Sequence, residues 1–411
     1  MNDKKKREKL IIYINPPYAE VSSKKINING EKGKKGVNKT LIQERYLDQL
    51  GTASRELYAQ FLIRINKELP GAYIANFSTL KNLQGSAFDK FRKNFKPKLN
   101  SLFVVPANTF DNVRGDFPIG FFIWDGSKKE SFKKITADVY NKDAELTGQK
   151  NFHLISKDQY INKWISQYKE KEPIDSIGFM DGINANDFQH NNIVYITNTN
   201  KFIPNPRGIW ITPRNIFPVA IYLSVRKVFK STWLNDRDQY IVPSSGWETD
   251  PLFQSDCLTY ALFNNKILTS FEKNGFVTPL TNQWIPFKEE EVQAKDCFEN
   301  HFMTDFISGQ YSPKTSPIID NSLIPTTKLT FSAEAREVFA TGKKLWQFYH
   351  SQKITNPNAS LYEIQKFFQN LQSDETAFKK YDELITELRN RIKILSENIK
   401  QKAILYGFLK L

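Results

Sequence analysis

The segment LIIYINPPY at residues 10–18 decides how the fold of this chain is interpreted. Residues 10–14 form a continuous apolar run rich in β-branched side chains, which is typical of a strand buried on both faces of a sheet. The strand is expected to end at Pro16 and Pro17, because proline cannot donate a hydrogen bond to a β-ladder. A polar turn at the carboxyl end of a strand is where ligands bind in open α/β sheets. We therefore expect residues 15–18 to contribute to a ligand site.

The residues after this turn alternate between helical and strand patterns. Residues 41–69 carry apolar side chains at helical spacing, and several short apolar or basic segments follow. The expected strands are 72–77, 102–105 and 119–124, with a short basic helix over 88–95. Alternation of strands and helices is the pattern of an α/β sheet, so we expect residues 1–137 to form one.

The remaining chain divides into an irregular region and a helical region. Residues 138–330 are rich in Asn, Asp, Pro and aromatic residues without a long helical period, and we expect them to form a mixed α+β domain. Residues 331–411 are strongly helical, with Ser332 as the candidate N-cap. One apolar stripe in this region consists of Leu384, Leu388, Ile392, Leu395 and Ile399. The stripe fits either packing within the protein, which we favour, or binding to a partner.

Composition excludes several classes of protein. The 411 residues are 40% hydrophobic and 14% aromatic, which is too apolar for a disordered chain. The two cysteines, Cys257 and Cys297, form no Cys-x-x-Cys, which excludes a disulfide scaffold and a zinc ribbon or finger. Charged residues interrupt every apolar run before it reaches membrane-spanning length, and residues 10–14 are too short for a signal-peptide core. We therefore expect a cytoplasmic protein with no membrane among its partners.

The positive charge of the chain indicates a polyanion as its partner. The formal net charge is +14, and residues 1–40 hold eleven Lys and Arg against four Asp and Glu, a net +7. A basic surface that serves only solubility is the alternative. Basic residues beside aromatic residues, as around Trp210, suit contact with the phosphates and bases of nucleic acid. The candidate DNA contacts are Lys24, Lys25, Lys32, Lys34, Lys35, Arg207 and Arg214.

The turn at residues 15–18 carries groups that suit an exocyclic amine. Pro16 and Pro17 restrict the backbone, so that the Asn15 side chain and a backbone carbonyl can point the same way. These two acceptors can take two hydrogen bonds from an amine, and Tyr18 offers a flat face on which a base can stack. An ordinary strand-ending turn, in which proline serves only as a breaker, is the alternative.

The strand followed by Asn-Pro-Pro-Tyr resembles the catalytic motif of methyltransferases that act on the amine of adenine in DNA. The same motif occurs in enzymes that methylate glutamine amides and RNA bases. Other segments resemble more narrowly the adenine-specific DNA methyltransferases of bacterial restriction–modification systems. These segments are 56–61, 110–125, 343–350 and 356–362. The chain is therefore similar to that family over most of its length.

The resemblance implies a catalytic mechanism. A flipped adenine would stack on Tyr18, while the Asn15 side chain and the Pro16 carbonyl would hold its amine for attack on the methyl group of S-adenosyl-L-methionine. Catalysis would come from positioning and from stabilising the positive charge that develops at the amine, without a metal. The resemblance thus makes Asn15, Pro16, Pro17 and Tyr18 the catalytic residues and double-stranded DNA the partner.

One departure from the family concerns the cofactor. The family binds it with a glycine-rich turn and an acidic residue before the catalytic strand, whereas nine residues precede Leu10 and no strand followed by Gly-x-Gly occurs downstream. We therefore expect a partial methyltransferase sheet over 1–137, a target-recognition region over 138–330 and a helical extension over 331–411. A complementary cofactor-binding polypeptide would complete the site for S-adenosyl-L-methionine. The alternatives are a non-catalytic DNA-binding remnant and an RNA or protein-amide methyltransferase.

Overall fold

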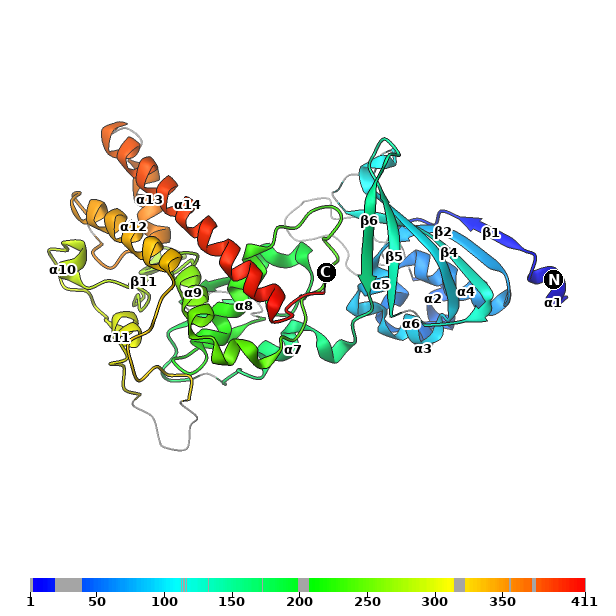
Figure 1. Cartoon of the computed structure of the whole chain (residues 1–411), viewed down its shortest axis with the longest axis horizontal. Helices are drawn as coiled ribbons and strands as arrows, with labels where there is room; N and C mark the ends of the chain where they lie inside the picture. The colour runs from blue at the N-terminus through cyan, green and yellow to red at the C-terminus, as the bar shows by residue number, and fades with distance from the viewer. Residues whose placement is uncertain are drawn as a thin grey trace.

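The computed structural model describes residues 3–18, 39–111, 113, 115, 117–131, 133–171, 173–198, 207–313, 322–354, 356–371 and 375–410. Two units lie along the long axis of the molecule (Figure 1). One contains the N-terminus and a large sheet, and the other is rich in helices. The chain returns to the junction between the two units at its C-terminal end (Figure 1).

The first unit is built on a six-stranded mixed sheet of order β1-β2-β4-β3-β5-β6. Its strands are β1 (Ile11–Ile14), β2 (Tyr73–Thr79), β3 (Pro97–Pro106), β4 (Pro118–Lys129), β5 (Lys134–Tyr140) and β6 (Leu146–His153). β1 is parallel to β2 and β3 is parallel to β5, whereas the other neighbouring strands are antiparallel. The α/β class expected from the alternating pattern is therefore confirmed for this part of the chain.

Helical segments precede and connect the strands of the first unit. They are α1 (Lys4–Arg7), α2 (Leu41–Arg45), α3 (Leu47–Leu50), η1 (Gly51–Arg55), α4 (Leu57–Glu68), α5 (Lys81–Gln84), η2 (Ser86–Phe88), α6 (Asp89–Asn94) and η3 (Ala107–Thr109). The single helix expected over 41–69 is thus divided into four elements. The division falls at Gly51, whose φ of +56° suits glycine and ends α3.

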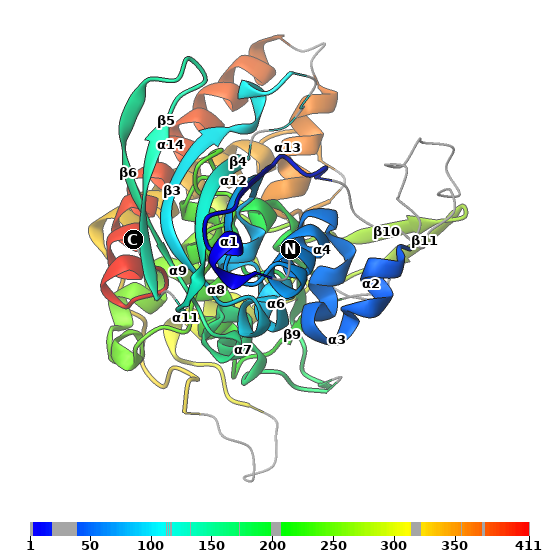
Figure 2. The same cartoon turned by 90° about the vertical axis from the view of Figure 1, so that its right-hand side faces the viewer.

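Helices cover one face of this sheet (Figure 2). Ile74, Phe122 and Trp124 are buried in the core that the sheet shares with α3, α4 and α6. Successive side chains of a strand point to opposite faces, and Phe77 and Phe121, which belong to the other face, are only half-buried. The sheet therefore has a helix-covered face and a face that the described part of the chain leaves partly open.

β1 is an edge strand and not the doubly buried strand that its composition predicted. Ile11 is 71% exposed and Tyr13 is 65% exposed, whereas Ile14 packs against the core of the covered face. The prediction was wrong because an apolar run does not reveal how many neighbours a strand has. β2 is the one described strand that pairs with β1.

The second unit begins after β6, because β5 crosses the boundary expected at 137–138. Its strands are β7 (Gly178–Asp181), β8 (Tyr195–Thr197) and β9 (Ile209–Ile211), in the antiparallel order β8-β7-β9, and the hairpin of β10 (Ser270–Lys273) and β11 (Phe276–Pro279). Its short helices are η4 (Lys157–Gln159), α7 (Ile161–Ser166), η5 (Phe188–Ile193), η6 (Ser245–Thr249), α10 (Glu289–Val292) and α11 (Phe302–Ser308). Its longer helices are α8 (Ile216–Val228), α9 (Pro251–Leu262), α12 (Ala333–His350), α13 (Leu361–Asn370) and α14 (Glu375–Leu405).

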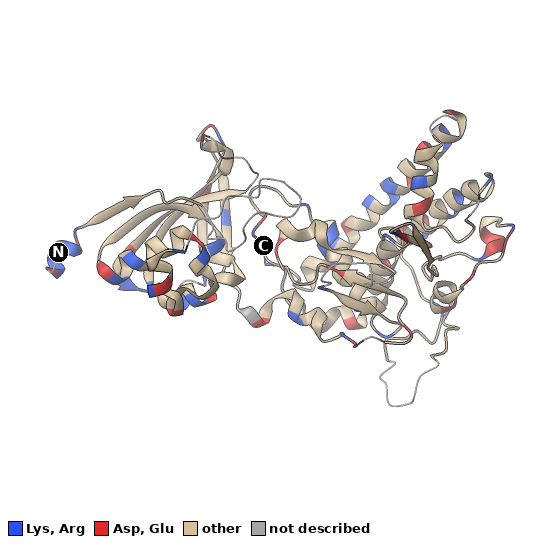
Figure 3. Cartoon of the chain, turned by 180° about the vertical axis from the view of Figure 1, so that it is seen from behind, with Lys and Arg blue, Asp and Glu red and all other residues tan. Residues whose placement is uncertain are grey.

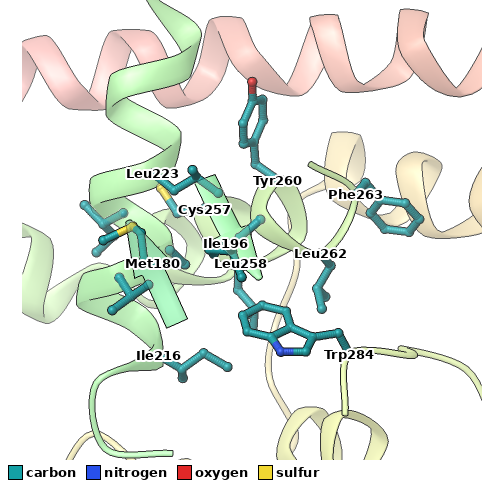
Figure 4. Close-up of a cluster of buried hydrophobic side chains, with 14 of the residues drawn as sticks. Met180, Ile196, Ile216, Leu223, Cys257, Leu258, Tyr260, Leu262, Phe263 and Trp284 are labelled. Carbon is teal, nitrogen blue, oxygen red and sulfur yellow. The ribbon is translucent and has the colours of Figure 1, made fainter. Parts of the chain in front are cut away.

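A single hydrophobic core joins the irregular region to the C-terminal helices. It extends from Ile161 to Leu409, and α14 packs against α8, α9 and α12. Figure 4 shows part of this core, with Tyr260 of α9 directed toward α14. Neither α8 nor α9 was expected, because helices buried on nearly all sides lack the polar face that reveals a helical period. The residues expected to form a recognition region and those expected to form a helical extension therefore share one core.

The burial of the apolar stripe on α14 generates a stability prediction. Leu388 is 0% exposed in the core, whereas Ile394 on the same helix is 51% exposed. We expect Leu388→Ala to lower the free energy of unfolding by about 2–5 kcal/mol, because it leaves a cavity. Ile394→Ala serves as the matched control and should change it by less than about 0.5 kcal/mol. Chemical denaturation of the isolated chain measures both, and an unchanged stability of Leu388→Ala would show that the stripe serves a partner.

Candidate functional site

The Asn-Pro-Pro-Tyr turn lies at the carboxyl edge of the sheet. β1 is parallel to β2, and β3 has the same direction because β4 is antiparallel to both β2 and β3. Asn15 therefore leaves the sheet at the same edge as Leu80 and Ala107, which follow β2 and β3. This is the edge at which open α/β sheets hold their ligands. It faces the second unit, because β1 runs from the N-terminal end of the molecule toward the junction (Figure 1).

Within the turn, side chains alternate between solvent and protein. Asn15 and Pro17 are exposed, whereas Pro16 is buried and Tyr18 is half-buried. The Tyr18 ring packs against a small apolar cluster that contains Ala107 and Ile119. The structure thus places the amide in solvent and the aromatic ring against the sheet, as a stacking surface beside an acceptor requires.

A side-chain hydrogen bond closes this turn. The Tyr18 hydroxyl donates to Asn15 Oδ1 at 2.7 Å. Burial, with a smaller contribution from Tyr13, raises the pKa of Tyr18 to about 12, so the hydroxyl remains a donor at neutral pH. A carbonyl oxygen has two lone pairs, so Asn15 Oδ1 keeps one acceptor position for a further donor.

Aromatic side chains continue from the turn across the open face of the sheet. We call Tyr13, Phe77, Phe103, Phe110 and Phe121 the aromatic face. Phe121 lies 6.2 Å from Tyr13, 4.7 Å from Phe77 and 5.1 Å from Phe103, measured between ring centroids, and Phe77 lies 5.2 Å from Phe110. All but Tyr13, which is exposed, are half-buried. The sequence did not predict this surface, because β1, β2, β3 and β4 each contribute one of its rings and the rings meet only when these strands pair.

The segment at 56–61 has a structural role in this unit. Tyr58 and Gln60 are buried, and Gln60 Nε2 donates to the Ser54 carbonyl at 2.7 Å. Glu56 forms an ion pair with Lys81 at 2.5 Å, which connects the beginning of α4 to the residues after β2. These contacts hold α4 at the carboxyl edge of the sheet.

Of the predicted DNA contacts, the structure describes Arg207 and Arg214. Lys24, Lys25, Lys32, Lys34 and Lys35 lie outside the described residues. Arg207 is exposed, and Trp210 nearby is half-buried. Lys and Arg are spread over both units, at α1 and along α14 among other places (Figure 3).

The structure corrects the prediction that Arg214 contacts DNA, because its guanidinium is paired with two carboxylates. It is 8% exposed and pairs with Glu170 at 2.7 Å and with Asp175 at 2.5 Å. These hydrogen bonds raise its pKa further above the ordinary value. A contact to a DNA phosphate would break both pairs, so we remove Arg214 from the candidate DNA contacts.

A polar cavity of about 380 Å³ lies where the two units meet. Arg55, Glu56 and Lys81 line it from the first unit, and Asp187, His190 and Arg237 are among the residues that line it from the second. His190 Nδ1 lies 2.5 Å from Asp187 Oδ1. Since Glu56 and Lys81 also belong to the carboxyl edge of the sheet, the second unit contributes side chains next to the edge that carries the turn.

A buried arginine holds the segment of the second unit that lines this cavity. Arg226 is 0% exposed, and its nitrogens donate to Asn191 Oδ1 at 2.9 Å, to the Ala185 carbonyl at 2.5 Å and to the Asp187 carbonyl at 3.0 Å. Its guanidinium also lies 4.9 Å from the centre of the Tyr240 ring. Every carbonyl it contacts lies in the segment that carries Asp187, so Arg226 is a structural residue and not a DNA contact.

No three His, Cys, Asp or Glu side chains in the described ranges are grouped as a metal site requires. No helix among the same residues is long and apolar enough to cross a membrane.

The buried Asp236 at the junction predicts a pH-dependent stability. It is 3% exposed, and burial raises the pKa of its carboxyl to about 7. An unfolded Asp has a pKa of about 3.9, so the folded protein binds more protons, and this stabilisation is lost as the pH rises from about 4 to 7. Asp236→Asn should therefore lose less stability between pH 5 and pH 8 than the wild type, by on the order of a few kcal/mol.

Thermal and chemical denaturation at the two pH values measure this difference. Asp143→Asn, at an exposed position in the turn between β5 and β6, is the matched control and should follow the wild type. Parallel pH profiles for the wild type and Asp236→Asn would contradict the assignment.

Comparisons with known proteins name no family for this chain. The scan against protein-family models finds no match. The search of curated proteins finds no significant match. The function must therefore be argued from the geometry of the turn and its surroundings.

Proposed function

We propose that this chain is the amine-binding portion of an adenine-specific DNA methyltransferase. The observation that carries the proposal is the turn at residues 15–18. It places an exposed carboxamide, a restricted backbone and a braced aromatic ring at the carboxyl edge of a parallel strand pair. This edge is the ligand-binding edge of an open α/β sheet, so the groups that suit an aminopurine lie where a ligand is expected.

The chain's own residues would orient the adenine. The remaining lone pair of Asn15 Oδ1 and the Pro16 carbonyl accept hydrogen bonds from the exocyclic amine, which directs the lone pair of its nitrogen away from both acceptors. The Tyr18 ring supports the flipped base by stacking. As positive charge develops on the nitrogen, the two oxygen dipoles stabilise it without needing to reorient. Catalysis by this portion is therefore a matter of position and electrostatics.

S-adenosyl-L-methionine would supply the methyl group in the completed enzyme, but the residues described here do not fit it. β1 is followed by Asn15, Pro16 and Pro17, and β2 by Leu80 and Lys81. β3 and β5, which run in the same direction, are followed by Ala107 and Asn141. None of these four strands therefore ends in a glycine turn that could approach a nucleoside closely. We therefore assign no cofactor contact to these residues. The proposal includes a complementary polypeptide that carries the cofactor site.

The second unit would contact double-stranded DNA. Its position at the carboxyl edge of the sheet would place the exposed Arg207 on the substrate side, with phosphate contacts supplying most of the affinity. Lys24, Lys25, Lys32, Lys34 and Lys35, which lie outside the described residues, are proposed as further phosphate contacts from their charge alone. Trp210 packs edge-on against Phe179, with 5.3 Å between ring centroids, so its ring has a fixed support. Contacts of this kind position DNA and do not by themselves select a sequence.

A non-catalytic DNA-binding protein is the second candidate. The observation in its favour is the hydrogen bond from Tyr18 to Asn15, which closes the turn on itself, combined with the missing cofactor turn. The two candidates differ in what Asn15 does, because a remnant would tolerate its replacement. Methylation of an RNA base or a protein amide would use the same turn with another amine donor and is separated by the substrate used.

Substitutions in the turn test the chemistry in the reconstituted enzyme. Asn15→Ala should lower the rate of adenine methylation by on the order of a hundred- to a thousand-fold, because one preorganised acceptor is lost. Tyr18→Ala should weaken capture of the flipped base by about 1–3 kcal/mol, through loss of stacking. Tyr18→Phe keeps the ring and releases Asn15 Oδ1, so we expect an effect of less than about tenfold, that of one neutral hydrogen bond.

Transfer of labelled methyl groups to duplex DNA, RNA and a glutamine peptide is the measurement. Phe61→Ala, on the exposed surface of α4, is the control for general damage. Near-normal methylation by Asn15→Ala would overturn the catalytic assignment, and methylation of RNA or peptide alone would redirect it.

Salt dependence tests the proposed DNA contact. Neutralising Lys32, Lys34 and Lys35 together should weaken binding on all sequences and reduce the slope of log K against log salt by about 3, because each phosphate contact releases about one counterion. The matched control removes the same charge at Lys379, Lys393 and Lys410, three exposed lysines of the second unit. Fluorescence anisotropy over a salt series measures both, and equal effects of the two triple variants would show that net charge alone causes binding.

A further inference from the structure

The outer edge of β1 presents backbone groups that pair with no other described strand. β1 and β2 pair in parallel from Ile11 opposite Tyr73 to Ile14 opposite Asn76, and the Tyr73 N–H donates to the Leu10 carbonyl at 2.9 Å. In a parallel ladder, alternate residues bond to the same neighbour with both N–H and C=O. Ile12 and Ile14 therefore face β2, while the N–H and C=O of Ile11 and Tyr13 point away from the sheet.

Nothing protects this edge among the described residues. Ile11 and Tyr13 are 71% and 65% exposed, and β1 carries neither a charge nor a bulge. Natural edge strands usually carry such features, because an apolar unprotected edge pairs with other strands. The opposite edge of the sheet, formed by β6, differs in these features.

At that opposite edge, β6 is polar and contacts the second unit. Lys150 on β6 pairs with Asp238 of the second unit at 2.6 Å, and the register of β6 against β5 is irregular near Tyr140. Gly148 within β6 has a φ of +150°, which interrupts a regular extended edge. One edge of the sheet is therefore closed and the other is open.

The open edge is continuous with the aromatic face. Tyr13 on β1 lies 6.2 Å from Phe121, which contacts Phe77 and Phe103 of the same face. Among the described helices of this unit, α2 to α6 cover only the opposite face. An occupant that adds a strand to β1 and a helix over these rings would satisfy both the backbone groups and the apolar side chains.

Charge distinguishes between two possible occupants. α1, which leads directly into β1, consists of Lys4, Lys5, Lys6 and Arg7, and no acidic residue lies within it. A second copy of this chain would bring another net charge of +14 to the contact. An α/β polypeptide with acidic residues beside its edge strand fits the open edge better.

We propose that β1 is the docking strand for a separate α/β polypeptide, which continues the sheet beyond β1 and places a helix on the aromatic face. The assignment of the cofactor site to this partner rests on the proposed function, whereas the docking itself rests on the edge and the face. The docked strand would receive hydrogen bonds from, and donate them to, Ile11 and Tyr13, as in β-strand addition.

The first experiment uses the full chain and, as the probe, the polypeptide encoded immediately upstream of it. We expect a one-to-one complex in analytical ultracentrifugation, formed without DNA and without cofactor. Amide hydrogen exchange followed by NMR should show slow exchange at Ile12 and Ile14 in the free chain, and new protection at Ile11 and Tyr13 in the complex. Absence of a complex, or a complex that leaves Ile11 and Tyr13 unprotected, would overturn the proposal.

Substitutions at the two edges of the sheet provide the matched comparison. Ile11→Pro removes an outward N–H at the first residue of an edge strand, where proline is tolerated, and Tyr13→Lys places a charge on the edge. Each should raise the dissociation constant by about tenfold or more, while leaving the thermal unfolding of the free chain within a few degrees. Leu146→Lys changes a 60% exposed side chain on β6 and should leave binding unchanged.

The outcomes separate docking from catalysis. A protected complex that fails to methylate DNA would support docking and contradict the proposed function. Methylation that survives Ile11→Pro and Tyr13→Lys with unchanged affinity would contradict docking and leave the proposed function standing. Dimerisation of the free chain with Ile11 and Tyr13 protected would show that a second copy occupies the edge, and would overturn the choice of partner.

Discussion

The parallel pairing of β1 with β2 is the constraint on which the candidate site depends. Only four residue pairs define it, from Ile11 opposite Tyr73 to Ile14 opposite Asn76. A shift of one residue would turn Tyr13 toward the helices and Ile14 toward the aromatic face, and it would displace the turn along the sheet. The burial of Ile14 in the core of the covered face opposes such a shift. Asn15 and Tyr18 are therefore positioned by a ladder of four residue pairs, and the burial of Ile14 on the covered face fixes the register of that ladder.

Polar contacts cross the junction between the units, beside the apolar packing of Trp233 and Leu234 on the core of the first unit. Tyr160 donates to the Gln84 carbonyl at 3.2 Å, and Lys150 pairs with Asp238 at 2.6 Å across the same boundary. Arg226 orders the segment that faces the first unit, and Asp236 is buried beside it with a raised pKa. Polar contacts fix direction as well as distance, so they can orient the second unit relative to the carboxyl edge of the sheet.

Three separate features have one explanation if the sheet is incomplete. No strand of the six-stranded sheet is followed by a Gly-x-Gly turn, β1 has an edge that no described residue protects, and the aromatic face lacks helices in the described part of the chain. An additional α/β portion would supply all three missing parts together. A chain that only binds DNA would need none of them, and its exposed Ile11 and Tyr13 would be a liability for aggregation.

The sequence alone determined the elements whose signal is local. The β-branched run before Pro16 and Pro17 gave a strand that ends at a turn, and the period of Leu384, Leu388 and Leu395 gave a self-packed helix. Both follow from side-chain periodicity and backbone restriction within a few residues. The position of the turn at the carboxyl edge of a sheet was also predictable, because it depends only on strand direction.

The tertiary structure decided what depends on partners distant in sequence. That β1 is an edge strand depends on β2 being its one described neighbour, and the aromatic face depends on where α2 to α6 pack. Arg214 appeared to be a surface cation until Glu170 and Asp175 were placed beside it, more than thirty residues away in the chain. α8 and α9 escaped prediction because complete burial removes the polar face that marks a helix. Apolar composition shows that a residue can be buried, but only the fold determines what covers it.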